Sequence, residues 1–267
     1  MARDQGGLTA ADTLGAVLVA LVLAAVIGLA VGSFLNVVVH RLPRGESLSH
    51  PGSHCPSCGH VVRKRDNLPV VSWLLLRGRC RDCAHPISAR YPLVEAVTAG
   101  LWVAVVAAKW DDAAAIALGI VLVTLMVAVV PIDLDHRLIL NKLTYPAAVV
   151  ALVIGLALDP GGVPEQLIAA FAAGGFFLLA ALAYPAGMGL GDVKLAFVMG
   201  LYLGRAVAPA VFAALILGVL VGGVIMARLG RERGRKTQVP FGPFLALGSV
   251  LALFAGDELV DSYTDTF

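Results

Sequence analysis

Apolar runs about as long as a bilayer is thick recur along this chain, and they limit the folds open to it. A helix needs about 20 apolar residues to cross a membrane. We find eight candidate spans, at residues 13–37, 92–109, 112–131, 143–158, 164–184, 193–204, 206–227 and 241–260. The sixth is too short to cross upright, so we expect it to be tilted or to form a half-helix.

The composition agrees with a polytopic membrane protein. Of the 267 residues, 59% are hydrophobic and 14% are charged, whereas a soluble domain is about 45–50% apolar and about 25% charged. Disordered chains are polar and rich in charge, so that class is excluded. The net charge of only +2 gives no basis for binding nucleic acid. We therefore predict an all-α polytopic membrane protein of about eight transmembrane helices, with a small polar part.

Basic residues mark one side of the predicted membrane protein. The loop from Arg41 to Tyr91 carries nine Lys or Arg residues against three acidic ones. Further basic residues fall on the same side if eight spans cross, at Arg137, Lys142, Lys194 and residues 228–236, while the opposite side carries Asp111, Asp112, Asp159, Glu165 and an acidic tail at 257–265. Cytoplasmic loops are enriched in Lys and Arg. We therefore predict cytoplasmic basic loops and two termini outside.

All four cysteines lie in the first basic loop, as the pairs Cys55/Cys58 and Cys80/Cys83. Two C-x-x-C pairs, here 21 residues apart, are typical of a structural zinc site with four thiolate ligands. The metal would supply the folding free energy of a loop with little apolar core. The alternative is two redox pairs, as in quinone-linked thiol oxidases, which fits less well because the cytosol keeps thiols reduced.

The histidines and a short apolar stretch of this loop are expected to support the zinc site without binding the metal. Five of the six histidines lie in or beside it, and we interpret them as surface residues or as neighbours of the ligands, since four cysteines complete a zinc site: His40, His50, His54, His60 and His85. The apolar stretch 68–76 is too short to span. We expect it to hold the module against the membrane interface, or else to form a short core element of the module.

Two aspartate-bearing segments stand at the predicted cytoplasmic membrane face. One is Pro131–His136, with Asp133 and Asp135, and the other is the glycine-rich stretch Gly187–Lys194, with Asp192. Charge within a span suggests function. Two carboxylates about 3 Å apart share a proton, so one can activate water while the other protonates a peptide carbonyl. Glycines let an extended substrate approach the backbone. The alternative interpretation is that the first segment is a charged cluster at the membrane interface and the second a glycine-rich turn, both of which are common at helix ends.

Several segments resemble those of the bacterial prepilin peptidases, the leader peptidases and N-methyltransferases of type IV pilins and pseudopilins. The resemblance runs through nearly the whole chain. It is carried by residues 32–43, 55–60, 67–72, 78–83, 90–95, Ile132–Asp135, Gly189–Lys194 and Pro240–Pro243.

The resemblance implies a membrane aspartyl protease of the Gly-x-Gly-Asp type in the bacterial inner membrane, with Asp133 and Asp192 as its catalytic pair. Residues two apart on a helix point about 200° apart, so only one of Asp133 and Asp135 can face Asp192, and the family pattern aligns Asp133. We expect Gly189, Gly191, Asp135 and Lys194 to bind substrate or to support the pair.

The implied substrate is a pilin precursor whose short basic leader ends in Gly, cleaved after that Gly at the cytoplasmic face. The resemblance also implies N-methylation of the new terminus with S-adenosylmethionine, for which no glycine motif here marks a cofactor site. The chain departs from the family in having Leu140-Asn141 in place of Pro-Asp and only a short connection from Pro43 to Cys55. The alternatives are a transporter, although no inverted repeat is evident, or a non-catalytic zinc-bearing assembly factor.

We expect three parts in the chain. Residues 1–38 form the first transmembrane helix, residues 39–91 form the cytoplasmic four-cysteine zinc module, and residues 92–267 form the transmembrane aspartyl peptidase domain.

Overall fold

The computed structural model describes residues 10–184, 188–230 and 239–266, and within these ranges it contains helices and no β-strand. The long helices are α1 (Ala10–Arg41), α3 (Arg90–Ala108), α4 (Ala113–His136), α5 (Asn141–Leu158), α6 (Val163–Ala183), α7 (Leu190–Leu203), α8 (Val207–Leu229) and α10 (Gly242–Thr264). The short ones are α2 (Val71–Leu75) and the 3₁₀ turns η1 (Leu42–Arg44), η2 (Lys64–Asp66) and η3 (Gly204–Ala206). The prediction of an all-α polytopic membrane protein is confirmed.

Seven helical segments of the described chain are long and apolar enough to cross a membrane, in place of the eight that we expected. The difference lies at the expected sixth and seventh spans. Here α7, η3 and α8 follow one another directly, and together they form one apolar segment, Leu190–Leu229. Alone, α7 has 14 residues, or about 21 Å, which is shorter than a bilayer core of about 30 Å. Both termini can lie outside only if the number of spans is even, which requires α7 and α8 to cross separately. The orientation therefore stays a prediction. The basic residues at 231–236 lie outside the described residues.

Two compact units divide the chain. Unit 1 comprises Met1–Asn36 and Ser49–Ile116, and unit 2 comprises Val37–Leu48 and Ala117–Phe267. In unit 1, glycines on α1 allow α3 to approach closely. A Cβ on Gly32 would lie 2.6 Å from the Cα of Glu95, a packing of small residues that is common between membrane helices. The Asn36 side chain donates a hydrogen bond to the Tyr91 carbonyl at 3.1 Å.

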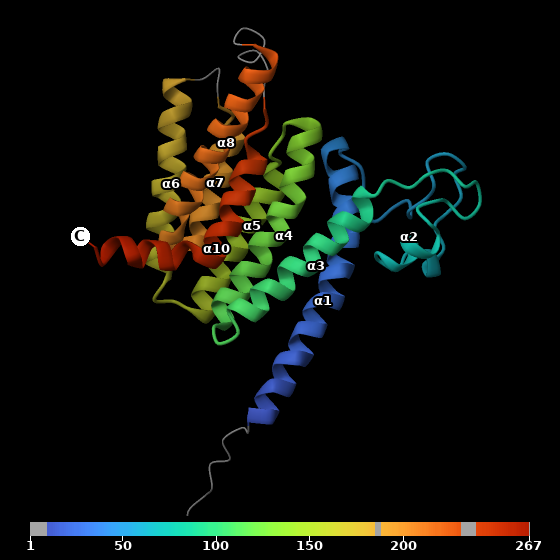
Figure 1. Cartoon of the computed structure of the whole chain (residues 1–267), viewed down its shortest axis with the longest axis horizontal. Coiled ribbons are helices and arrows are strands. Elements are labelled where there is room, and N and C mark those ends of the chain that lie inside the picture. Colours follow the sequence, from blue (N-terminus) through green and yellow to red (C-terminus); the bar gives the residue numbers. More distant parts are fainter. Residues whose placement is uncertain (1–9, 185–187, 231–238, 267) are drawn as a thin grey trace, which may run out of the picture. The chain divides into compact units, whose positions relative to one another are not determined.

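In unit 2, α7 is the most enclosed helix. From Leu195 to Leu203 its side chains are buried except for Phe197, which is half-buried. Its neighbours include α6, α5, α8 and α10, and α10 also packs along α8 (Figure 1). The hydroxyl of Tyr202 donates to the Ala147 carbonyl of α5 at 2.7 Å. Since α7 carries Asp192 in its first turn, this packing fixes where that carboxylate lies.

A charged cluster holds the turn between α7 and α8. The Arg205 backbone N–H donates to a carboxylate oxygen of Glu165 on α6 at 2.8 Å. Its guanidinium lies 2.7 Å from Asp261 and 3.6 Å from Asp257, both on α10. These side chains are about half exposed, so solvent screens the pairs and their main effect is orientation. Arg205 is one of the few basic residues on the acidic side of the predicted topology, and this arrangement neutralises it.

Replacing Gly200 with Ala is expected to destabilise unit 2, because a Cβ there would overlap the backbone of Ala170 on α6. Overpacking of this kind costs about 1–3 kcal/mol, which exceeds the roughly 1 kcal/mol that Ala gains over Gly in a helix. The melting temperature of the detergent-solubilised protein should fall. Gly175→Ala on α6, where a Cβ meets open space, is the control and should not lower it. Equal melting of both variants would contradict the close α6–α7 packing.

Candidate active site and metal centre

Asp133 lies near the end of α4 and is only 5% exposed. One of its carboxylate oxygens, Oδ2, accepts a hydrogen bond from the backbone N–H of Gly242 at 2.9 Å. Gly242 is the first residue of α10, and the free N–H groups at a helix N-terminus carry partial positive charge that attracts a carboxylate. The start of α10 therefore fixes the position of the Asp133 side chain.

Asp192 stands in the first turn of α7, and Gly189 precedes that helix in an extended conformation with φ −82° and ψ 146°. The Asp192 backbone N–H donates to the Gly189 carbonyl at 3.1 Å, and the Gly189 amide in turn faces the Asp192 carboxylate. This carboxylate is close enough to Asp133 for the two charges to repel each other. The fold thus brings together two acids that are 59 positions apart in sequence.

Asp135 has a different environment from Asp133. Its side chain is exposed, whereas Asp133 is buried, as expected for residues two apart on a helix. The next turn carries Arg137, whose charge acts on Asp133 and whose backbone has a positive φ of 54°. Asp133 and Asp135 therefore offer one enclosed and one accessible carboxylate at the end of α4.

The two described glycines of the glycine-rich stretch have different surroundings. A Cβ on Gly191 would lie 3.0 Å from the Cβ of Ile139, so glycine there lets α7 begin close to the α4–α5 connection. Gly189 is exposed, and the atom nearest to a Cβ added there would be a carboxylate oxygen of Asp192, at 3.6 Å. Gly189 therefore leaves open backbone beside Asp192. Gly187 lies outside the described residues.

Lys194 joins the start of α7 to the start of α5. Its ammonium donates a hydrogen bond to Asn141 Oδ1 at 2.9 Å and lies 5.6 Å from the centroid of the Tyr145 ring. Asn141 is one of the two positions at which the chain departs from the family pattern. Its amide oxygen still accepts from Lys194, and α5 still begins at this residue.

Sequence reasoning missed the contribution of Gly242. Its segment, Pro240–Pro243, attracted attention only as part of the resemblance, and no charge or periodicity pointed to Asp133. The close approach explains the glycine, since a Cβ on Gly242 would lie 2.6 Å from Asp133 Oδ2. The signal that was available is the Phe241-Gly242-Pro243 sequence at the start of the last span, because helix starts attract carboxylates.

The four cysteines form a second candidate site, in unit 1. All four Sγ atoms lie within 4.8 Å of one another, and Cys55 Sγ is 3.8 Å from Cys83 Sγ. Four sulfurs bound to one Zn²⁺ at about 2.3 Å stand about 3.8 Å apart at the corners of a tetrahedron. The cysteines are free thiols. The donor set and its spacing therefore fit a structural zinc ion.

Each cysteine pair is held in a similar tight turn. The Cys55 N–H donates to the His60 carbonyl at 2.9 Å, and the Cys80 N–H donates to the His85 carbonyl at 2.8 Å. Backbone N–H groups of Cys58 and Ser57 point at the Cys55 sulfur and lower the pKa of that thiol to about 6. Burial and the neighbouring thiols raise the pKa of Cys58 and of Cys83, so in the absence of a cation Cys55 is the thiol of the cluster that ionises first. The five nearby histidines are exposed, and none belongs to the cluster.

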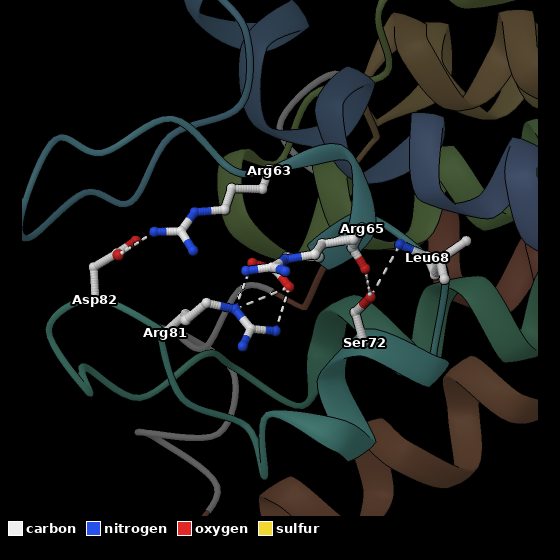
Figure 2. Close-up of polar contacts among 7 residues, drawn as sticks. Arg63, Arg65, Leu68, Ser72, Arg81 and Asp82 are labelled. Carbon is white, nitrogen blue, oxygen red and sulfur yellow. Dashed lines mark hydrogen bonds and ion pairs between the residues drawn. The ribbon is translucent and has the colours of Figure 1, made fainter.

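Ion pairs and a serine hydroxyl hold segments of the cysteine module together (Figure 2). Arg81 forms a bidentate contact with Asp66, with distances from 2.6 to 3.2 Å, and this hydrogen bonding lowers the pKa of Asp66. Arg63 pairs with Asp82 at 2.8 Å. The buried Ser72 hydroxyl accepts from the Leu68 N–H and donates to the Arg65 carbonyl. The two ion pairs connect the second cysteine pair to the chain that follows the first, and the Ser72 hydroxyl fixes α2 to η2.

Replacing Cys58 with Ser is expected to remove the bound metal, because three thiolates leave a structural zinc site incomplete. Elemental analysis of purified parent protein should give about one zinc per chain, and the variant should give far less. Since metal binding supplies folding free energy, limited proteolysis of residues 49–89 should be faster in the variant. Ser57→Ala, beside the ligand, is the control. Parent protein without zinc, or with a disulfide in each pair, would overturn the assignment.

Comparisons with known proteins match the two segments in which these candidate sites lie. The family model described as "Bacterial Peptidase A24 N-terminal domain" matches residues 26–109, and the one described as "Type IV leader peptidase family" matches residues 120–226. The first contains the cysteine cluster, and the second contains both Asp133 and Asp192. No solved structure gives a significant match.

Curated relatives match along most of the chain. A protein of Aeromonas hydrophila named prepilin leader peptidase/N-methyltransferase is 38% identical over 90% of this chain and 92% of its own length. Its namesake from Stutzerimonas stutzeri is 34% identical over 95% and 96%, and that from Myxococcus xanthus is 36% identical over 80% and 65%. The chain therefore belongs to the prepilin leader peptidase/N-methyltransferase family of multi-pass membrane proteins.

Proposed function

We propose that this chain is a membrane aspartyl endopeptidase that removes the leader of prepilins and pseudopilins, cleaving after a Gly at the cytoplasmic face of the bacterial inner membrane. The observation that carries the proposal is the approach of Asp133 on α4 to Asp192 on α7, inside a fold whose relatives are named for this activity. Two acids near each other and partly shielded from water share a proton more readily than both ionise.

The chemistry needs one proton and one water molecule. The ionised carboxylate takes a proton from water as the water oxygen attacks the carbonyl carbon, and the protonated partner donates its proton to the carbonyl oxygen. The resulting gem-diol collapses when the carboxyl group formed from the water proton returns that proton to the amide nitrogen. The C–N bond breaks as the partner carboxylate takes back a proton from one hydroxyl of the gem-diol, so a carboxylic acid and an amine leave and the pair again holds one proton. The pair needs neither a covalent intermediate nor a metal ion for these steps.

The surroundings of the pair suit an extended peptide with a basic leader. Gly189 offers exposed, extended backbone next to Asp192, against which a peptide strand can hydrogen-bond. We propose that Gly191 permits the close approach of α7 to Ile139, that Asp135 contacts the basic leader, and that Lys194 orients α7 through Asn141. Residues 92–267 would form the peptidase domain after residues 1–38 and the 39–91 zinc module.

N-methylation of the cleaved product is the second activity that we propose, and it is supported by the names of the relatives. Relatives are named N-methyltransferases, so we propose that the chain also methylates the new N-terminus, with S-adenosylmethionine as donor. The Zn²⁺ at the four cysteines has a structural role in this proposal, because four thiolates leave no open position for water or substrate.

Mass measurement of a treated substrate separates the two activities. Purified protein in lipid nanodiscs is incubated with a synthetic prepilin segment that contains the leader, its terminal Gly and the start of the hydrophobic helix. We expect loss of the leader, and gain of one methyl group only when S-adenosylmethionine is present. Leader loss that persists when both Asp133 and Asp192 are replaced by Asn would overturn the aspartyl mechanism, and no leader loss by the parent protein would favour a non-catalytic assembly factor.

A further inference from the structure

The cysteine module exposes an apolar surface that its own fold leaves uncovered. Four large apolar side chains on and before α2 are turned outward: Leu68 is 55% exposed, Val71 49%, Leu74 61% and Leu75 76%. Val71, Leu74 and Leu75 stand at i, i+3 and i+4, which places them on one face of the helix. We refer to these four side chains as the α2 face. A module in water would be expected to turn such a face inward.

The opposite side of α2 is fixed to the module. The Ser72 hydroxyl is buried and bonded to two backbone groups. The Trp73 indole N–H donates to the Ile87 carbonyl at 3.0 Å, and its ring packs against Gly78, where a Cβ would lie 2.9 Å from the ring. Because these contacts hold the inner side, α2 cannot rotate to bury its apolar residues without breaking them.

A hydrogen bond sets the depth of this face along α3. The N–H of Val70, at the residue just before α2, donates to a carboxylate oxygen of Glu95 at 2.7 Å. Glu95 is five residues beyond the first residue of α3, a rise of about 7.5 Å. α3 is apolar and long enough to span, and the second turn of a helix that spans from its first residue stands close to the headgroup region. The α2 face therefore lies at the same depth.

Basic residues flank the α2 face in the sequence, and we refer to them as the basic border. Lys64 and Arg65 precede it on η2, Arg77 and Arg79 follow it, and all four are exposed. In the part of the chain that the structure describes, the ion pairs of the module use Arg63 and Arg81, and of the four border residues only Arg65 also acts on Asp66 through its charge. Apolar side chains flanked by Lys and Arg are typical of segments that lie in the headgroup region of an anionic leaflet.

We infer that the α2 face inserts into the leaflet at which α3 begins and that Lys64, Arg65, Arg77 and Arg79 bind the phosphates of anionic lipids there. The bilayer is the occupant that both the depth and the charge select. A second copy of the chain or the hydrophobic helix of a substrate would cover the apolar residues too, but neither accounts for the basic border at headgroup level.

Quenching of a fluorescent amino acid at a single position tests the inference on the full chain. The reporter replaces Leu75 in one variant and the exposed Ser53 of the same module in the control, and each variant is placed in nanodiscs that contain phosphatidylglycerol as the anionic lipid. We expect lipids brominated on the acyl chains to quench position 75 several-fold more than position 53. Iodide in the water should show the reverse order. Melting temperatures equal to the parent's establish that the module is folded.

A second set of variants tests whether the basic border binds anionic lipid. Replacing Arg77 and Arg79 with Gln, with the reporter at 75, is expected to reduce bromolipid quenching in anionic nanodiscs towards its value in phosphatidylcholine alone. Iodide quenching at 75 as strong as at 53 would overturn membrane insertion. Protection of position 75 from both quenchers would overturn it as well and point to a protein contact. Equal bromolipid quenching with and without phosphatidylglycerol would overturn the assignment of the border to anionic lipid.

Discussion

Leader cleavage by the Asp133→Asn or Asp192→Asn variant is expected to fall by at least about a thousandfold, within the range of 10²–10⁴ typical for loss of a general acid or base. An amide has nearly the shape of a carboxyl group but can neither take a proton from water nor give one to the substrate. Because the two carboxylates act as one unit, the double variant should be no slower than either single one. Initial rates of leader release from a synthetic prepilin measure the effect.

The control for this pair is Asp135→Asn, which changes an exposed carboxylate on the same turn of α4. We expect its cleavage rate to stay within about fivefold of the parent, as for loss of an exposed charge contact. Methylation of a substrate that is already cleaved should survive all three changes if the two activities use separate sites. If Asp135→Asn is inactive and Asp133→Asn is active, the catalytic residue of α4 is Asp135 and not Asp133. Full activity of both Asp133→Asn and Asp192→Asn would refute the aspartyl mechanism.

Replacing Gly242 with Ala is expected to slow cleavage by about a hundredfold, the usual result of misplacing a catalytic group by about 1 Å. The new methyl group would stand 2.6 Å from Asp133 Oδ2, so the carboxylate has to move away from the N–H that now holds it at 2.9 Å. Gly242 is a positioning residue in this account, and the loss should appear in kcat with little change in KM.

The matched control is Gly222→Ala on α8, where a Cβ meets open space. It should keep the rate and the melting temperature of the parent. If Gly242→Ala melts normally and cleaves at the parental rate, the start of α10 does not hold Asp133 in the working enzyme. A larger loss in Gly242→Leu than in Gly242→Ala would agree with displacement of the carboxylate by added volume.

The sequence was sufficient for features that depend on local periodicity and short spacing. Apolar runs of about 20 residues identify membrane helices because each must satisfy its backbone hydrogen bonds within itself, so the class of fold follows without knowledge of packing. The cysteine cluster is equally local in origin, since a C-x-x-C pair forms one tight turn and two such pairs supply four ligands. The spacing of Asp133 and Asp135 on one helix likewise requires that they face different ways.

Tertiary structure decided what depends on contacts between distant segments. The approach of Asp192 to Asp133, the N–H of Gly242 on the Asp133 carboxylate and the bond from Lys194 to Asn141 join residues 53 to 109 positions apart, and no periodicity encodes such pairs. The boundary expected between the sixth and seventh spans agrees with the one between α7 (Leu190–Leu203) and α8 (Val207–Leu229), and only the number of spans differs. Hydropathy reads that stretch as two spans, whereas the 14-residue α7 is shaped by packing against α6 and by the Arg205 turn. Local sequence determines which segments prefer the membrane. The positions of the polar side chains on those segments depend on helix packing, because a single glycine at a crossing point decides how closely two backbones approach.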